Sequence, residues 1–186
     1  MNASYLTFFW QSLVFPRLGL PYGWGGSLSP NPTDETDCSG WVSAALSCMM
    51  RGPNMIYARQ FWTGTFAGIQ PGPTGVIQGI QDTANLVCVA SLDQVPADAP
   101  MTIAILQTGS DPSTAANAHM ICSVRGTVTE MGGGPNNFHT GGQPGSTQID
   151  DPEFNQFLYL PGPVALDAPD YTDPKVWALL EQQFAA

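Results

Sequence analysis

The sequence has few basic residues and lacks the features of an exported or membrane-spanning chain. Only 5 Lys and Arg accompany 15 Asp and Glu, for a formal net charge of −10. Phosphate backbones are bound mainly by basic side chains, so we expect no nucleic-acid partner. No run reaches the roughly 18 apolar residues that cross a bilayer. The apolar first residues have neither the positive leader nor the cleavage site of a signal peptide. We therefore expect no membrane insertion and no export signal.

The cysteines lack the spacing of a metal site or of a disulfide scaffold. Cys38, Cys48, Cys88 and Cys122 include no CxxC pair, which argues against bound zinc. We expect all four to be thiols, and we expect the protein to use no metal or organic cofactor.

The length and the order of the sequence patterns predict one α+β domain. A chain of 186 residues can bury one hydrophobic core, and 20 Gly and 17 Pro predict many loops. Apolar spacing predicts a helix at 3–15 and a second helix from Cys38 to about residue 51. Helices followed by antiparallel strands are typical of an α+β fold. The strands are expected at 86–91, 101–108, 118–124, 127–131 and 156–160.

The other segments carry weaker signals. Residues 54–85 look irregular, with short helices as an alternative, and the glycine-rich stretch 132–146 is expected to be a loop. Residues 173–185 have the apolar spacing of a short amphipathic helix. We place the domain at 1–168 and a C-terminal helical extension, or the start of a linker, at 169–186.

A candidate nucleophile stands at the start of the second predicted helix. Residues 37–40 read Asp-Cys-Ser-Gly, which puts Cys38 in the first turn. There the unpaired backbone N–H groups and the helix dipole stabilise a thiolate, and the same amides can hold an oxyanion. Asp37 opposes the thiolate by its charge, and it is either the helix N-cap or a group that binds a substrate amine. The alternative for Cys38 is a small buried residue with no chemical role.

The segment 21–26 reads Pro-Tyr-Gly-Trp-Gly-Gly and precedes Asp-Cys-Ser-Gly. This pair of motifs resembles the NlpC-type cysteine peptidases, which implies a papain-like fold with the nucleophile helix packed on an antiparallel sheet. The resemblance makes Cys38 the nucleophile and suggests Tyr22, Asp37 and Ser39 as substrate-binding residues. Glycines let the loop backbone pack closely against the nucleophile.

The candidate base is one of two histidines. The family pattern favours His119, which lies in a predicted strand, over His139, which lies in the glycine-rich stretch. A base imidazole needs a third group to fix its tautomer. A two-residue turn at 125–126 places Glu130 on the same face as His119 and diagonal to it, within reach of two long side chains. A three-residue turn places Glu130 on the opposite face. The alternative for Glu130 is a solvated hairpin charge.

Further motifs resemble the N-terminal peptidase domain of mycobacteriophage endolysins. Glu130 begins a Glu-Met-Gly-Gly-Gly string that is similar to the string after the base in those domains. The segment 25–32 matches their Gly-Gly-x-x-x-x-Asn-Pro run, and 151–159 matches their aspartate-proline and aromatic strand. The chain departs from the family at 96–98, which read Pro-Ala-Asp in place of Pro-Gly-Asp, and at Met131, where a small polar residue is usual.

The resemblance implies a peptidoglycan endopeptidase that uses Cys38, His119 and Glu130 to cut stem peptides, with the D-glutamyl to diaminopimelate bond as the expected target. A phage endolysin of this kind is made in the host cytoplasm and acts at the cell wall at lysis. An acidic enzyme is repelled by an anionic wall polymer, so we expect a wall-binding domain or partner. The alternatives are a virion tail-associated wall hydrolase, an amidase or acyltransferase on the same scaffold, and a non-catalytic wall-binding module.

Overall fold

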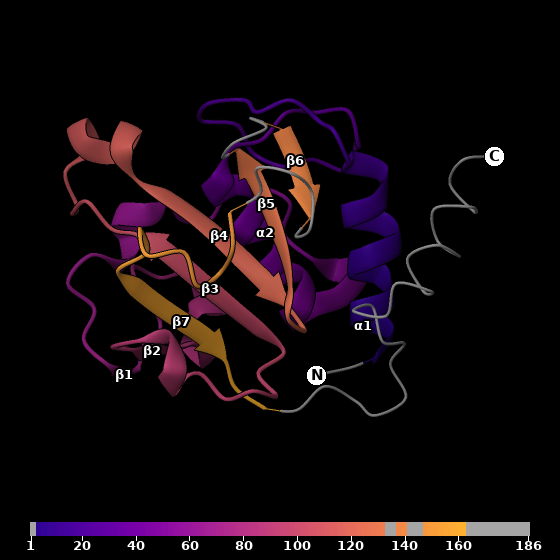
Figure 1. Ribbon diagram of the computed structural model, residues 1–186. Helices are drawn as coiled ribbons and strands as arrows, with labels where there is room; N and C mark the ends of the chain where they lie inside the picture. Colours follow the sequence, from indigo (N-terminus) through magenta and orange to yellow (C-terminus); the bar gives the residue numbers. More distant parts are fainter. Residues whose placement is uncertain (1–2, 133–136, 141–146, 163–186) are drawn as a thin grey trace.

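A computed structural model describes residues 3–132, 137–140 and 147–162. The chain forms an antiparallel sheet of seven strands in the order β1-β2-β7-β3-β4-β5-β6, with helices packed on it (Figure 1). The strands are β1 (Gly72–Pro73), β2 (Val87–Val89), β3 (Met101–Leu106), β4 (His119–Val124), β5 (Thr127–Gly132), β6 (Asn137–Thr140) and β7 (Gln156–Leu160). The predicted α+β class is confirmed.

The helices come mainly from the first third of the chain. The predicted helix at 3–15 is confirmed as one helical stretch: α1 (Ala3–Phe8), a π-helical segment (Phe9–Val14) and a 3-10 turn (Phe15–Arg17). The second helix is α2 (Cys38–Arg51), and it begins at the predicted residue. Short 3-10 turns occupy Gly52–Asn54, Thr63–Phe66, Gln81–Asn85, Leu92–Gln94 and Pro112–Asn117. In the described part of the chain, no helix is long and apolar enough to span a membrane.

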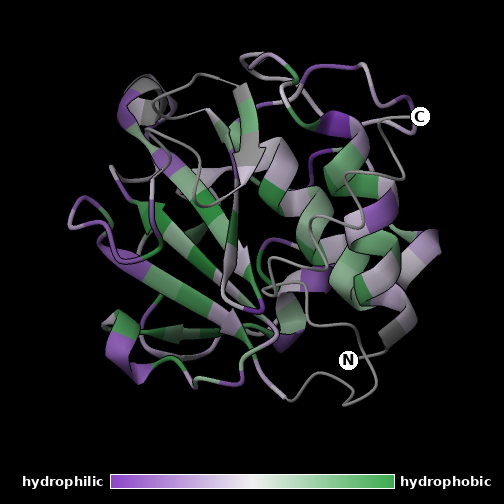
Figure 2. Cartoon of the chain, turned by 45° about the vertical axis from the view of Figure 1, so that its right-hand side comes forward, coloured by the Kyte–Doolittle hydropathy of each residue, from purple (hydrophilic) through white to green (hydrophobic). Residues whose placement is uncertain are grey.

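Helix α2 lies in the middle of the hydrophobic core. Every residue from Cys38 to Met49 is buried, because α2 packs on β4 and β5 on one side and against α1 on the other. Figure 2 shows apolar residues along these helices and on the strands that they cover. Trp41 fixes this packing: its Nε1 donates to Thr129 Oγ1 over 3.1 Å, and its ring centroid lies 4.2 Å from that of Phe138. The helix that carries Cys38 is therefore tied to β5 and β6.

The hairpin of β4 and β5 has the register predicted with a two-residue turn. Val124 pairs with Thr127, and Cys122 pairs with Thr129. Arg125 and Gly126 both have positive φ angles, 50° and 80°. Two successive positive φ angles are those of a type I′ turn, whose twist matches the strands that it joins.

One prediction about the less regular segments is wrong. The expectation of a loop through 132–146 is wrong at 137–140, because β6 lies there and pairs with β5; His139 stands opposite Glu130 in this pairing. A four-residue strand between glycine-rich stretches has too short a pattern to be read from composition. The segment 54–85 holds two 3-10 turns and β1. The predicted helix at 173–185 and the boundary at 168 lie outside the described residues.

Candidate active site

The start of α2 is packed tightly against the glycine-rich loop that precedes it. Asp37 is the N-cap, and its Oδ1 accepts from Gly40 N over 2.6 Å. A Cβ at Gly40 would overlap Gly26 O and Thr36 Oγ1, and a Cβ at Gly26 would overlap the backbone in turn. Only glycine fits at both positions, so the two predicted motifs are in direct contact. Cys38, which is 7% exposed, follows as the first residue of the helix.

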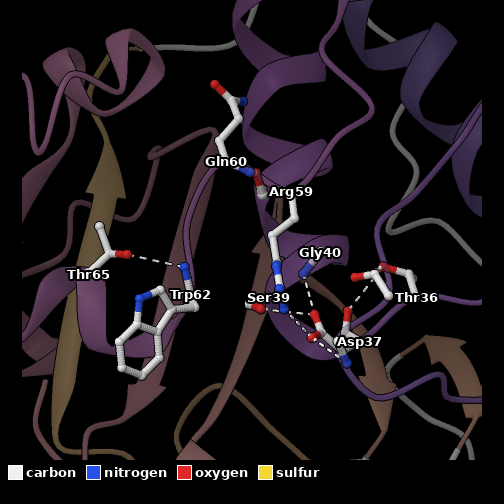
Figure 3. Close-up of polar contacts among 11 residues, drawn as sticks. Thr36, Asp37, Ser39, Gly40, Arg59, Gln60, Trp62 and Thr65 are labelled. Atoms are coloured by element: carbon white, nitrogen blue, oxygen red, sulfur yellow. Dashed lines mark hydrogen bonds and ion pairs between the residues drawn. The ribbon is translucent and has the colours of Figure 1, made fainter. Parts of the chain in front are cut away.

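Asp37 is held by four hydrogen-bond donors, and three of the residues that supply them, Ser39, Gly40 and Arg59, are labelled in Figure 3. Its Oδ1 accepts from Gly40 N and from Ser39 Oγ at 2.9 Å. Its Oδ2 accepts from Gly25 N at 3.1 Å and from Arg59 at 2.7 Å. The N-cap alternative for Asp37 is confirmed. Because Arg59 forms an ion pair with it, the negative charge beside the thiol is compensated within the protein.

The candidate base lies across from Cys38, at the first residue of β4. His119 Nε2 and Glu130 Oε1 are 2.7 Å apart, and the Glu130 side chain is fully buried. The contact that the turn register predicted is therefore present, and Glu130 is not a solvated hairpin charge. His119 also stacks on Phe154, with ring centroids 6.3 Å apart.

Gly132, with φ at 104°, leaves room for Tyr22, whose ring carbons lie 3.1 and 3.2 Å from where a Cβ would stand.

Thr147 holds the far side of the Glu130 carboxylate. Its backbone N–H donates to Oε2 over 3.2 Å, and its hydroxyl donates to Oε1 over 3.0 Å. A buried carboxylate is costly unless it is paired and hydrogen-bonded. Thr147 and His119 together supply such partners.

The electrostatics of the site favour a protonated His119. Burial by itself lowers the pKa of His119, but hydrogen bonds to Cys38 and Glu130, together with their negative charges, raise the pKa to about 10. Because Nε2 is engaged by Glu130, Nδ1 is the nitrogen that remains for the thiol. Burial, the charges of Cys38 and Asp37, and a hydrogen bond to Cys38 also raise the pKa of Tyr22. Cys38 therefore lies between two side chains that can donate to its sulfur.

Cys38 opens into a cleft of about 370 Å³. Its lining includes the three expected substrate-binding residues Tyr22, Asp37 and Ser39. It also includes Trp24, Arg59 and Trp62, of which Arg59 and Trp62 come from the segment after α2. Among the described residues, no group of three or more His, Cys, Asp or Glu side chains is arranged to hold a metal ion. All four cysteines are free thiols, as predicted.

Three residues of the site were not foreseen from the sequence. Arg59 and Trp62 lie in the segment that looked irregular, and Thr147 follows the glycine-rich stretch. No local pattern marks any of them. The arrangement as a whole, a thiol at a helix N-terminus facing an imidazole that a buried carboxylate holds, is suited to acyl transfer through a covalent intermediate.

Comparison with known proteins identifies a family. The family model described as Endolysin A matches residues 6–167, which include the whole of α2, the whole sheet and every residue of the site. No curated protein matches the chain, and no solved structure matches it. Because the family match covers most of the sequence, the chain belongs to the Endolysin A family of phage cell-wall hydrolases.

Proposed function

We propose that the protein is a peptidoglycan endopeptidase with a papain-like thiol mechanism, in which Cys38 is the nucleophile, His119 the base and Glu130 the group that orients it. The observation that carries the proposal is the continuous series of contacts from Cys38, which lines the cleft, through His119 to Glu130. Because the chain belongs to a family of cell-wall hydrolases, we infer that its substrate is peptidoglycan. The resemblance to NlpC-type peptidases suggests the bond between D-glutamate and diaminopimelate.

The first half of the reaction forms an acyl-enzyme. His119 is protonated in the resting site because its pKa is raised to about 10, so it donates a hydrogen bond to the sulfur of Cys38 and stabilises the negative charge that develops on the attacking sulfur. The sulfur attacks the carbonyl carbon of the stem peptide, and the backbone N–H at the start of α2 stabilises the oxyanion. The imidazolium of His119 then gives its proton to the leaving amine as the C–N bond breaks.

The second half releases the product. Neutral His119 takes a proton from a water molecule, and the resulting hydroxide attacks the thioester carbonyl. The C–S bond breaks, the carboxylic acid leaves and the resting site is restored. Throughout, Glu130 keeps Nε2 of His119 protonated and Nδ1 directed at the sulfur, while Thr147 keeps Glu130 in place. Tyr22, Asp37 and Ser39 border the bound stem.

The test is mass spectrometry of purified diaminopimelate-type peptidoglycan after digestion with the wild type, Cys38→Ala and His119→Ala. We expect new stem fragments with the wild type and none with either variant. Cys38→Ala should unfold at a temperature close to that of the wild type. His119→Ala leaves the buried Glu130 without its ion-pair partner, so it should unfold at a lower temperature while remaining folded during the assay. Cys88→Ala is the matched control, because Cys88 is also a buried thiol but lies on β2 and does not line the cleft. It should cut as the wild type does.

Other results would replace the proposal. Full activity of Cys38→Ala would rule out the thiol mechanism. Products in which the sugar is separated from an intact stem would indicate an amidase. If the wild type bound the polymer and released no fragments, the protein would be a wall-binding module.

A further inference from the structure

We propose that Trp24 and Trp62 form a subsite for an amino sugar of the wall glycan, so that the enzyme acts on stems that are still attached to the glycan. This inference rests on the proposed peptidase function and adds its substrate class. It follows from three features of the cleft: an exposed indole, a second indole held in a fixed orientation, and a carboxylate with no open acceptor position.

Trp24 is the first feature. It is 67% exposed, and within the described ranges the other exposed large apolar side chains reach at most 47%. A single exposed apolar residue is common and needs no explanation. Trp24, however, borders the same cleft as Cys38, and so does Trp62. Two tryptophans therefore border the cleft into which the nucleophile opens, where the proposed substrate binds.

Trp62 is the second feature, because its ring is fixed. A Cβ at Gly64 would overlap ring carbons of the indole, among them Cζ2 and Cζ3. Glycine is therefore required for the ring to lie against the backbone there. The backbone N–H of Trp62 donates to Thr65 Oγ1 over 3.2 Å, as Figure 3 shows. An aromatic wall that is already ordered loses little conformational entropy when it binds a ligand.

The chemical structure of peptidoglycan indicates which of its parts would bind to Trp24 and Trp62. Stem peptides of the diaminopimelate type consist of alanine, glutamate and diaminopimelate, which are small or charged and have no flat apolar surface. The pyranose rings of the glycan have such a surface, formed by axial C–H bonds, with polar groups around the edge. Indole rings present a large, rigid face and an N–H at the edge. The sugar is therefore the part of the substrate that matches Trp24 and Trp62.

Asp37 is the third feature. A stem that has been cut from its sugar ends in a free, positively charged amine, whereas an attached stem has an amide at that position. A carboxylate accepts about four hydrogen bonds, and Asp37 already accepts four, one of them from the cationic Arg59. The cleft therefore offers no open acceptor on Asp37 for a free amine. This also favours the attached stem.

The test compares two substrates with the same peptide: a disaccharide-tetrapeptide released from the wall by a muramidase, and the tetrapeptide without sugar. We expect wild-type kcat/KM to be higher for the disaccharide-peptide. Trp24→Ala should lower that value by about 3- to 10-fold, the range expected from an aromatic contact, and should lower the value for the free peptide by less. Trp24→Phe should recover part of the loss. Val76→Ala is the control, since Val76 is 47% exposed but does not line the cleft.

The outcomes separate this inference from the proposed function. If the wild type cuts the free peptide as fast as the disaccharide-peptide, or if Trp24→Ala lowers both rates equally, the sugar subsite is wrong and the peptidase function stands. If the wild type cuts neither substrate, the proposed function is wrong and the sugar subsite falls with it. A preference for the sugar that disappears in Trp24→Ala supports both.

Discussion

The site of Cys38 contains two buried carboxylates, Asp37 and Glu130, and each forms an ion pair with a different kind of basic side chain. Asp37, at the start of α2, is paired with Arg59, a guanidinium that stays charged at any ordinary pH. Glu130, on β5, is paired with His119, an imidazole that can gain and lose a proton. The charge of Asp37 is therefore permanently compensated, and its role is to cap the helix and hold the loop. The charge of Glu130 acts on a group that titrates, so it can control the chemistry.

Replacing Glu130 tests this difference between the two carboxylates, and it should have the largest effect on kcat/KM of the changes considered. In Glu130→Gln, His119 loses both the charge and the strong hydrogen bond that help to raise its pKa, so the pKa of His119 falls. The imidazolium is then lost at a lower pH, and the alkaline limb of kcat/KM against pH moves to lower pH. The rate near neutrality should fall by roughly 10- to 100-fold, as is typical when a group that orients a histidine is removed.

The matched change on the other carboxylate is Asp37→Asn. Asp37 does not contribute to the pKa shift of His119, so the alkaline limb of this variant should stay where the wild type has it, whatever happens to the absolute rate. If both variants moved the limb equally, or if Glu130→Gln left it in place, the division of roles between the two carboxylates would be wrong.

The second prediction concerns stability, and here Asp37 should matter more. Asp37→Ala removes the N-cap of α2 and leaves Arg59 without its carboxylate, so the free energy of unfolding should fall by about 1–2 kcal/mol. Urea unfolding followed by fluorescence measures it. Asp37→Ser retains a capping oxygen without the charge and should recover part of the loss. Asp34→Ala is the control, since Asp34 is an exposed carboxylate of the same loop; an equal loss there would contradict the special role of Asp37.

The sequence predicts those parts of the site whose positions depend on residues close to them in the chain. Cys38 was placed at a helix start because an apolar helical face follows it, and the position of Glu130 followed from a two-residue turn at Arg125. Both depend on residues within one hairpin or one helix. Papain-like packing and the roles of Cys38, His119 and Glu130 in catalysis stay predictions.

The parts that were missed depend on contacts between distant segments. Arg59 reaches Asp37 from a segment without periodic apolar residues, and its charge alone does not say which carboxylate it meets. The strand β6 has four residues, too few for an alternating pattern to stand out from the glycines around it. The sequence therefore predicts a loop at His139, although this residue lies opposite Glu130 on a strand.

Thr147 provides the last and smallest test, because it donates two hydrogen bonds to Glu130 and is not among the residues that line the cleft. Thr147→Val keeps the size and the backbone N–H but removes the hydroxyl donor, and a lost hydrogen bond of about 1 kcal/mol corresponds to a loss of roughly fivefold in kcat. Thr147→Ser restores the hydroxyl and should restore kcat, while thermal unfolding stays close to that of the wild type in both. A valine variant as active as the wild type would mean that the backbone N–H of Thr147 is enough to hold Glu130. If Thr147→Ser has wild-type kcat and Thr147→Val does not, the hydroxyl of residue 147 is needed to orient the Glu130 carboxylate. Glu130 would then differ from Asp37 in how its orientation affects catalysis, as well as in the effect of its charge.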